Sequence, residues 1–159
     1  MDHSPVRRVG IISDTHGLLR PPAIEKLNGV THIIHAGDIG RRAVLEALQA
    51  LAPLTAVRGN MDEIGWSGEI PDTQAVELGE AWIYVLHDLQ RLDLDPAAAG
   101  FRAVIFGHTH RPSAEWKNGV LYLNPGSAGP KRFRLPVSMA MLQIEGKDLQ
   151  YRFYRYQNQ

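Results

Sequence analysis

The chain has 159 residues, a length that fits one domain with a sizeable buried core, and we expect a single domain over residues 1–159. Lysine plus arginine and aspartate plus glutamate each number 17, so no overall charge favours stable binding to nucleic acid or to an anionic membrane. The chain contains no cysteine, which excludes disulfides, thiolate metal sites and thiol catalysis. Any metal ion must therefore be held by oxygen and imidazole nitrogen.

The N-terminal segment has only a short apolar run before Asp14. This run is far shorter than the apolar region of a signal peptide or the roughly 20 residues of a membrane span. We therefore expect a soluble, cytoplasmic protein with no membrane partner.

In chain order, short apolar runs rich in β-branched residues predict buried strands with polar residues at their carboxyl ends. Two helical patterns, 21–27 and 41–51, separate the early runs and give a βαβα beginning. The predicted strands are 9–13, 32–35, 55–57, 82–86, 103–106 and 120–123.

Later in the chain the pattern favours hairpins. Segments 73–78 and 82–87 flank a Gly79-Glu80 turn, and segments 137–144 and 149–156 flank Gly146-Lys147. A short helix is expected near 95–99. Parallel strands early and hairpins late predict an α/β fold in which two mixed β-sheets pack together with helices outside.

Side chains that bind metal ions follow five of the predicted strands. Their motifs are Ser13-Asp14-Thr15-His16-Gly17, Ala36-Gly37-Asp38, Arg58-Gly59-Asn60-Met61-Asp62, Leu86-His87-Asp88 and Gly107-His108-Thr109-His110. Ligands of open α/β sheets gather beyond the carboxyl ends of strands, so we expect these motifs on one edge of a sheet. Residues two apart in a strand project to the same side, so Asp14 with His16, or His108 with His110, is expected to chelate one ion.

Each motif also has a structural interpretation. A single Asp after a strand, such as Asp14 or Asp38, is more often a turn or helix-capping residue, and Asn60 suits a turn with positive φ. The five motifs together favour metal binding. Seven donors are too many for one tetrahedral ion and suit two divalent ions that share a carboxylate. Oxygen and imidazole ligands favour Mn²⁺, iron, Ni²⁺ or Zn²⁺, and Mn²⁺ is our first expectation.

Two neighbouring cations lower the pKa of a bridging water, and the resulting hydroxide can attack phosphorus while the metals bind the phosphoryl oxygens. Hydrolysis of phosphoesters follows, and no side-chain nucleophile is needed. The candidate catalytic groups are this metal-bridging water and Asn60, whose amide nitrogen can contact phosphate.

The ordered motifs from Asp14 to His110 resemble those of the calcineurin-like metallophosphoesterases. The short length, Gly59-Asn60-Met61-Asp62 and Asn124-Pro125-Gly126-Ser127 are similar to the small YfcE-type phosphodiesterases. The resemblance implies a four-layer αββα sandwich. It also implies that Asp14, His16 and His110 hold one metal ion, that Asp38 bridges, and that Asn60, His87 and His108 hold the second ion.

The chain departs from the larger relatives at Met61, where many of them have a His thought to protonate the leaving oxygen. Methionine cannot donate a proton. Either Asp62, by orienting a neighbour, or solvent must take that role, so substrates with good leaving groups should be favoured.

Basic residues near these motifs are candidates for substrate binding. Arg58 precedes Gly59-Asn60 and is expected to face an anionic substrate or to form a structural ion pair. Lys131 and Arg132 follow the loop at Asn124 and are expected to meet substrate phosphate or to form an ordinary solvated surface.

The leading hypothesis is a metal-dependent enzyme acting on small phosphodiesters, with monoesters as a second substrate class. A nuclease of the same superfamily is an alternative that the neutral charge and short length disfavour. A noncatalytic interaction scaffold, like the retromer subunit that resembles phosphoesterases, is another, disfavoured because all seven donors are present. Trp66 and the aromatic tail permit a homo-oligomer without requiring one.

Overall fold

The computed structural model describes residues 5–62, 68–131 and 134–156. Over these ranges the chain forms ten strands, two α-helices and one short 3₁₀ helix, η1. In chain order these are β1 (Arg7–Ile12), α1 (Pro21–Leu27), β2 (His32–His35), α2 (Arg42–Gln49), β3 (Leu54–Ala56), β4 (Thr73–Leu78), β5 (Ala81–Leu86), η1 (Leu89–Arg91), β6 (Phe101–Ile105), β7 (Ser113–Lys117), β8 (Val120–Asn124), β9 (Val137–Glu145) and β10 (Asp148–Tyr156).

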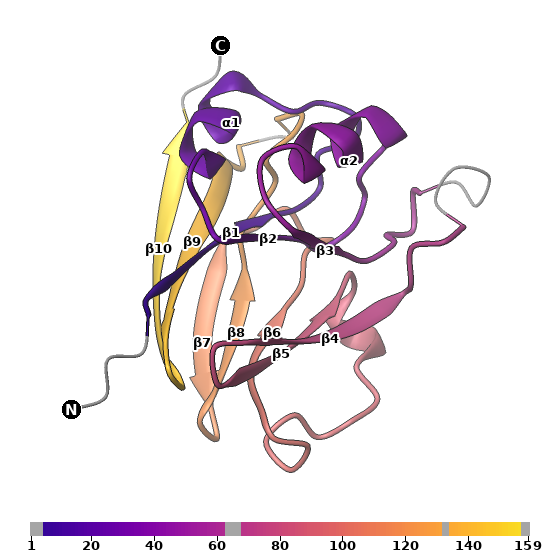
Figure 1. Ribbon diagram of the computed structural model, residues 1–159. Helices are drawn as coiled ribbons and strands as arrows, with labels where there is room; N and C mark the ends of the chain where they lie inside the picture. Colours follow the sequence, from indigo (N-terminus) through magenta and orange to yellow (C-terminus); the bar gives the residue numbers. More distant parts are fainter. Residues whose placement is uncertain (1–4, 63–67, 132–133, 157–159) are drawn as a thin grey trace.

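The strands form two mixed sheets of five strands each (Figure 1). The first sheet has the order β10-β9-β1-β2-β3, in which β1, β2 and β3 are parallel and β9 and β10 form an antiparallel hairpin. The second has the order β4-β5-β6-β8-β7, in which β5, β6 and β8 are parallel and both edge strands are antiparallel. The prediction of two mixed sheets is confirmed.

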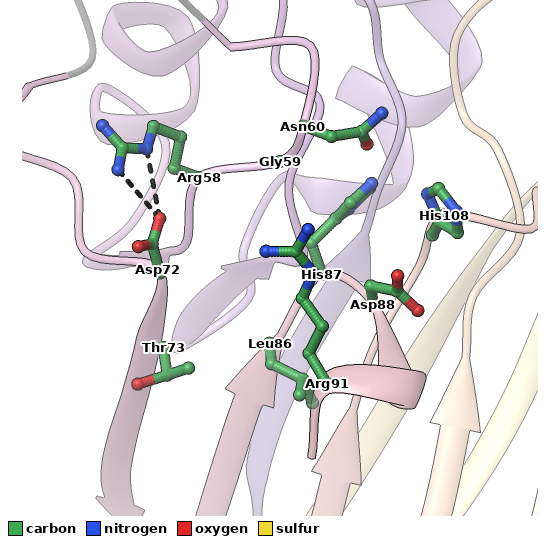
Figure 2. Close-up of a pocket in the computed structure, with 10 residues that line it drawn as sticks. All are labelled: Arg58, Gly59, Asn60, Asp72, Thr73, Leu86, His87, Asp88, Arg91 and His108. Carbon is green, nitrogen blue, oxygen red and sulfur yellow. Dashed lines mark hydrogen bonds and ion pairs between the residues drawn. The ribbon is translucent and has the colours of Figure 1, made fainter. Parts of the chain in front are cut away.

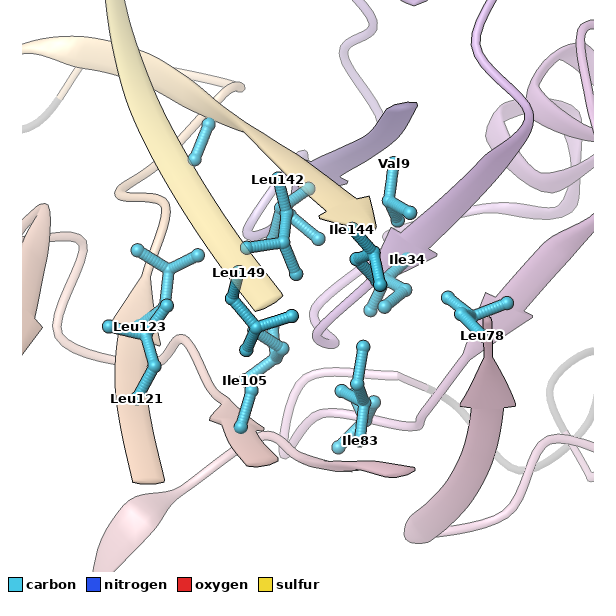
Figure 3. Packing of buried hydrophobic residues seen from close by; sticks show 14 of the residues in the cluster. Val9, Ile34, Leu78, Ile83, Ile105, Leu121, Leu123, Leu142, Ile144 and Leu149 are labelled. Carbon is cyan, nitrogen blue, oxygen red and sulfur yellow. The ribbon is translucent and has the colours of Figure 1, made fainter. Parts of the chain in front are cut away.

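Three apolar clusters hold the layers together. The largest lies between the sheets, where Ile11 and Ile34 of the first sheet pack with Ile83 and Ile105 of the second (Figure 3). On the outer face of the first sheet, Leu27 of α1 joins the second cluster. The outer face of the second sheet is covered by η1 and the residues after it rather than by an α-helix. The α/β sandwich is confirmed, with a single 3₁₀ turn as the helical part of the fourth layer.

The helices follow from local sequence. Two prolines open α1, where the missing backbone N–H groups cost nothing, and Ala23 and Leu27 bury one face. In α2, Val44 and Leu48 are buried four residues apart, as expected for an amphipathic helix, which ends two residues before the predicted boundary. No helix among the described residues is long and apolar enough to cross a membrane.

Two features of the second sheet differ from expectation. The predicted short helix at 95–99 is wrong: the amide of Ala99 donates to the carbonyl of Asp95 and closes a single turn, which Gly100 ends at a φ of 88°. Strand β7 was not predicted, because four of its five side chains are exposed and only Ala114 packs on the core. An edge strand of this kind has no apolar alternation by which it could be found.

Candidate metal centre

The predicted ligands lie just beyond the carboxyl ends of parallel strands, and both sheets contribute them. In the first sheet Asp14 and His16 follow β1, Asp38 follows β2 and Asn60 follows β3; in the second, His87 follows β5, and His108 and His110 follow β6. The expectation of one sheet edge is wrong in this respect. The parallel strands of two packed sheets end at the same side of the sandwich, which brings the two sets of ligands together.

The ligand residues stand in loops with a left-handed backbone. Among the described residues six non-glycine residues have a positive φ, and five of them are Asp14, His16, Asp38, His108 and His110, with φ from 46° to 74°. Such conformations cost roughly 1–3 kcal/mol each and cluster at functional sites. The argument that these pairs project from an extended strand is therefore wrong: the loops, and not the strand pleat, aim the side chains.

Each carboxylate has one oxygen fixed by the protein and one facing the centre. Oδ2 of Asp14 accepts from the Ser13 hydroxyl at 2.7 Å and from the His108 amide at 3.1 Å. Oδ1 of Asp38 accepts from the Met61 amide at 2.8 Å. In contrast, Oδ1 of Asp14 is buried and has no hydrogen-bond partner. A buried carboxylate oxygen without a donor is costly unless a cation binds it.

Imidazole nitrogens surround these oxygens. Nε2 of His110 lies 3.4 Å from Oδ1 of Asp14, and Nε2 of His16 lies 3.6 Å from Oδ2 of Asp38. Nε2 of His87 is 3.3 Å from the same Asp38 oxygen. Two overlapping groups of ligand atoms result, each within 4.8 Å: one joins Asp14, His16 and His110, and the other joins Asp14, Asp38 and His87.

The tautomer of His87 explains why this arrangement suits a metal ion. Nδ1 of His87 lies 2.8 Å from the carbonyl oxygen of Ala36, which can only accept, so Nδ1 carries the proton. In the neutral ring Nε2 then presents a lone pair to the carboxylate oxygen of Asp38. Two facing lone pairs repel unless a cation lies between them, and imidazole and carboxylate are ligands for divalent transition metals.

The carboxylate of Asp38 and the imidazole of His87 shift each other's pKa. Burial opposes ionisation of Asp38, but a protonated His87 and the Met61 amide hold the pKa of Asp38 below its usual value. Burial likewise opposes protonation of His87, but Asp38 and Asp14 raise the pKa of His87. A metal cation bound between Asp38 and His87 would therefore compete with a proton for the same carboxylate and imidazole atoms.

Asn60 and His108 lie on the more exposed side of the centre and line a pocket together with His87 (Figure 2). The ring centroid of His108 is 5.2 Å from that of His87, whereas His110 contacts His16. His110 belongs to the first of the two groups of ligand atoms, whereas His108 belongs to neither and lies beside His87 of the second. Binding of these two histidines to different ions, as the resemblance implies, stays a prediction.

A buried network ties the first two ligand loops together. The amide of Gly37 donates to Nδ1 of His35 at 3.1 Å, which leaves the ring proton on Nε2. Nε2 donates to the Thr15 hydroxyl at 2.9 Å, and that hydroxyl donates to the carbonyl of Ile39 at 2.8 Å. Burial lowers the pKa of His35 to about 4, although nearby carboxylates oppose the shift. A neutral His35 therefore positions the loops that carry Asp14 and Asp38.

Asp62 holds backbone rather than facing the centre. Its Oδ1 accepts from the Gly40 amide at 3.0 Å and its Oδ2 accepts from the Gly59 amide at 2.9 Å. The side chain is buried, with 7% exposed. Asp62 thus joins the loop after β2 to the loop after β3, which fits the expectation that it orients neighbours.

Glycines in the ligand motifs allow neighbouring ligand loops to approach one another closely. A Cβ atom on Gly59 would meet Oδ1 and the backbone nitrogen of Asp38, and one on Gly107 would meet the Ser13 hydroxyl. Each glycine therefore makes room for a neighbouring ligand loop.

The loop after β8 braces the centre, a role that the sequence did not reveal. The side-chain amide of Asn124 donates to the carbonyl of Gly107 at 3.0 Å and to the Thr109 hydroxyl at 3.1 Å. The Ser127 hydroxyl donates to the carbonyl of Asp14 at 3.0 Å. A turn motif such as Asn124-Pro125-Gly126-Ser127 carries no signal for these distant partners.

The candidate substrate residues differ in their surroundings. Arg58 lines the pocket, and its guanidinium pairs with Asp72 at 3.0 Å, as the structural interpretation predicted. Lys131 is exposed and is not among the residues that line the pocket. Arg132 and Trp66 lie outside the described residues.

Comparison with known proteins identifies the family. The profile of the calcineurin-like phosphoesterase superfamily domain matches residues 8–147, and the chain belongs to this superfamily. The chain is 35% identical over 153 residues to a probable metallophosphoesterase of Methanocaldococcus jannaschii, covering 87% of this chain and 77% of that protein. It is 29% identical over 161 residues to the phosphodiesterase YfcE of Escherichia coli, covering 82% and 84%.

The fold is shared more widely. The crystal structure of Vps29 from Chaetomium thermophilum superimposes with a TM-score of 0.82 and covers 95% of this chain and 88% of that one. The sequence identity is 19%, so this likeness shows the common fold alone.

Replacing Asp38 by Ala should reduce the number of bound Mn²⁺ ions from two per chain to one or none, because Asp38 faces both histidine groups. Elemental analysis after equilibrium dialysis measures the stoichiometry. Asp148→Asn, an exposed carboxylate on β10, is the control and should bind as the unaltered protein does. Two ions in the Asp38 variant would contradict the bridging role.

His35 should make stability depend on pH. Its folded-state pKa of about 4 lies below the ordinary value of 6.5, so its contribution is fully present above pH 6.5 and is lost as the pH falls toward 4. At about 1.4 kcal/mol per pH unit, some 2 kcal/mol should be lost between pH 6.5 and 5. Urea unfolding in a chelator compares the unaltered protein with His35→Asn. The stability gap between them should narrow by that amount, and a constant gap would refute a neutral His35.

Proposed function

We propose that this chain is a dinuclear metal-dependent phosphodiesterase that hydrolyses small phosphodiesters and uses Mn²⁺, while its ligand types also suit iron, Ni²⁺ or Zn²⁺. The observation that carries the proposal is the buried, unpartnered Oδ1 of Asp14 among the Nε2 atoms of His16, His87 and His110. The names of the relatives, a probable metallophosphoesterase and a phosphodiesterase, support the reaction class.

Residues of both sheets would share the ligation. Asp14, His16 and His110 would hold one ion, Asn60, His87 and His108 the other, and Asp38 would bridge them. Two divalent ions supply, when bound, an activated water and positive charge opposite the phosphoryl oxygens. The protein holds the carboxylates in the required orientation through Ser13, Met61 and the amide of His108, so little reorganisation is needed during the reaction.

Small substrates are supported by the size of the adjacent pocket. Its volume is about 280 Å³, which suits a small organic group and is close to the lower end of ligand pockets. The balanced charge of the chain gives no track for a polynucleotide. These observations favour a small phosphoester over a nuclease substrate.

Protonation of the leaving group is assigned to solvent. Both oxygens of Asp62 are engaged by backbone amides, so its carboxylate is not available as an acid. The Met61 side chain is 62% exposed and carries no proton to donate. The leaving oxygen would therefore depart with much of its negative charge, which makes the rate depend on the leaving group.

A noncatalytic scaffold is the second candidate, because the fold matches Vps29 closely. Five converging donors, Asp14, His16, Asp38, His87 and His110, with a buried oxygen of Asp14 and Nε2 of His87 left without partners, favour catalysis. A purely structural core would have satisfied these atoms with internal hydrogen bonds.

The protein should hydrolyse bis(p-nitrophenyl) phosphate in Mn²⁺, lose this activity on chelation, and regain it when Mn²⁺ is restored. Release of p-nitrophenolate is the measurement. Asp14→Asn should lower kcat by at least about a hundredfold, since it removes a ligand shared by both groups. Metal-independent turnover, or none on either bis(p-nitrophenyl) phosphate or p-nitrophenyl phosphate, would refute the proposed reaction.

The logarithm of kcat should fall steeply as the pKa of the leaving alcohol rises in a series of aryl and alkyl methyl phosphodiesters. Neither Met61 nor Asp62 can protonate the leaving oxygen, so its charge is proposed to be accommodated by solvent. Single-turnover kinetics establish that chemistry is being measured. A slope near zero under those conditions would show that a general acid is present.

A further inference from the structure

The pocket beside the metal centre is built from both sheets and from η1 (Figure 2). One side is formed by the His87 and His108 rings and by Asn60, so a phosphoester bound at the metals would extend one of its groups into this space. Its other lining residues are Arg58, Gly59, Asp72, Thr73, Leu86, Asp88 and Arg91.

The acidic side chains of the pocket already have partners. Oδ1 of Asp72 accepts from both Nε and Nη2 of Arg58, at 3.1 Å and 3.0 Å. Oδ1 of Asp88 accepts from the amide of Gln90 at 3.0 Å and caps η1. Asp72 therefore neutralises Arg58, whereas Asp88 is held by the backbone of its own helix and keeps its negative charge.

Arg91 is the cation of the pocket that has no ion-pair partner among the described residues. Among the described residues it forms no ion pair with Asp72 or Asp88, and Figure 2 shows its side chain extending from η1 toward the part of the pocket that His87 lines. Its backbone is fixed, because the amide of Arg91 donates to the carbonyl of Asp88 at 3.0 Å. Leu89 and Leu92 on either side pack onto the outer face of the second sheet and anchor this turn.

We infer that this pocket binds the non-reacting ester group of the substrate and that Arg91 selects diesters in which this group carries a second anion, a carboxylate or a phosphate. A guanidinium forms paired hydrogen bonds with such groups. The Arg58–Asp72 pair forms a rigid, neutral wall, and the volume of about 280 Å³ accommodates a short chain of a few carbon atoms. This inference rests on the proposed phosphodiesterase activity and adds the substrate class.

The test uses two diesters that differ only in charge: 3-carboxypropyl p-nitrophenyl phosphate and 3-carbamoylpropyl p-nitrophenyl phosphate. The unaltered protein in Mn²⁺ should prefer the carboxylate by about tenfold in kcat/KM, the factor for one partly exposed charge-assisted contact. Arg91→Gln should abolish the preference without changing turnover of the carboxamide by more than about twofold, and Arg91→Lys should restore part of it. Arg155→Gln, an exposed arginine of β10, is the matched control and should keep the preference.

Binding of the unreactive analogues 3-carboxypropylphosphonate and 3-carbamoylpropylphosphonate to the Mn²⁺-loaded protein, measured by calorimetry, separates the two proposals. If neither diester is hydrolysed but the carboxylate analogue binds more tightly through Arg91, anion binding by the pocket is supported and the proposed reaction is refuted. If both diesters are hydrolysed without preference, the proposed reaction is supported and the role of Arg91 is refuted. An equal loss of preference in the Arg91 and Arg155 variants would also refute it.

Discussion

The structure depends on a cluster of carboxylate oxygens and imidazole nitrogens whose lone pairs face one another. Oδ1 of Asp14 and Oδ2 of Asp38 can only accept hydrogen bonds, and Nε2 of His87 lies 3.9 Å and 3.3 Å from them with a proton already on Nδ1. Such a cluster is unfavourable in a folded chain until protons or metal cations lie between its members. The strained loops, the motif glycines and the buried His35 network hold these atoms in place, as the proposed metal site requires.

Much of this candidate site could be predicted because residues of metal-binding types directly follow the predicted strands. Buried parallel strands appear as short apolar runs, so both sheets could be predicted. A single polar residue after such a run is more often a turn or capping residue, and only the five motifs together made metal binding the better interpretation. The apolar periodicity could not predict the direction in which each ligand side chain points. His108 and His110 are two residues apart, yet positive φ at both turns them toward different partners.

Features that depend on tertiary contacts could not be predicted from the sequence. Strand β7 is exposed on nearly all its side chains and left no apolar pattern, while the turn near Asp95 carries helix-forming residues but is ended early by Gly100. Asn124 and Ser127 brace loops that lie far away in the chain. Arg91 showed no motif at all. The role proposed for Arg91 follows only from the charges of the pocket, where Arg58 already pairs with Asp72.

Two sheets thus bring the proposed ligands together, loops orient them, and the adjacent pocket is proposed to select the substrate. The claim at the centre is that two metal ions bind side by side and share Asp38. Electron paramagnetic resonance of the protein loaded with two equivalents of Mn²⁺ tests it most directly. The account predicts the many-line spectrum of an exchange-coupled Mn²⁺ pair that is lost in Asp38→Ala, and the six-line spectrum of isolated Mn²⁺ ions in the unaltered protein would contradict it.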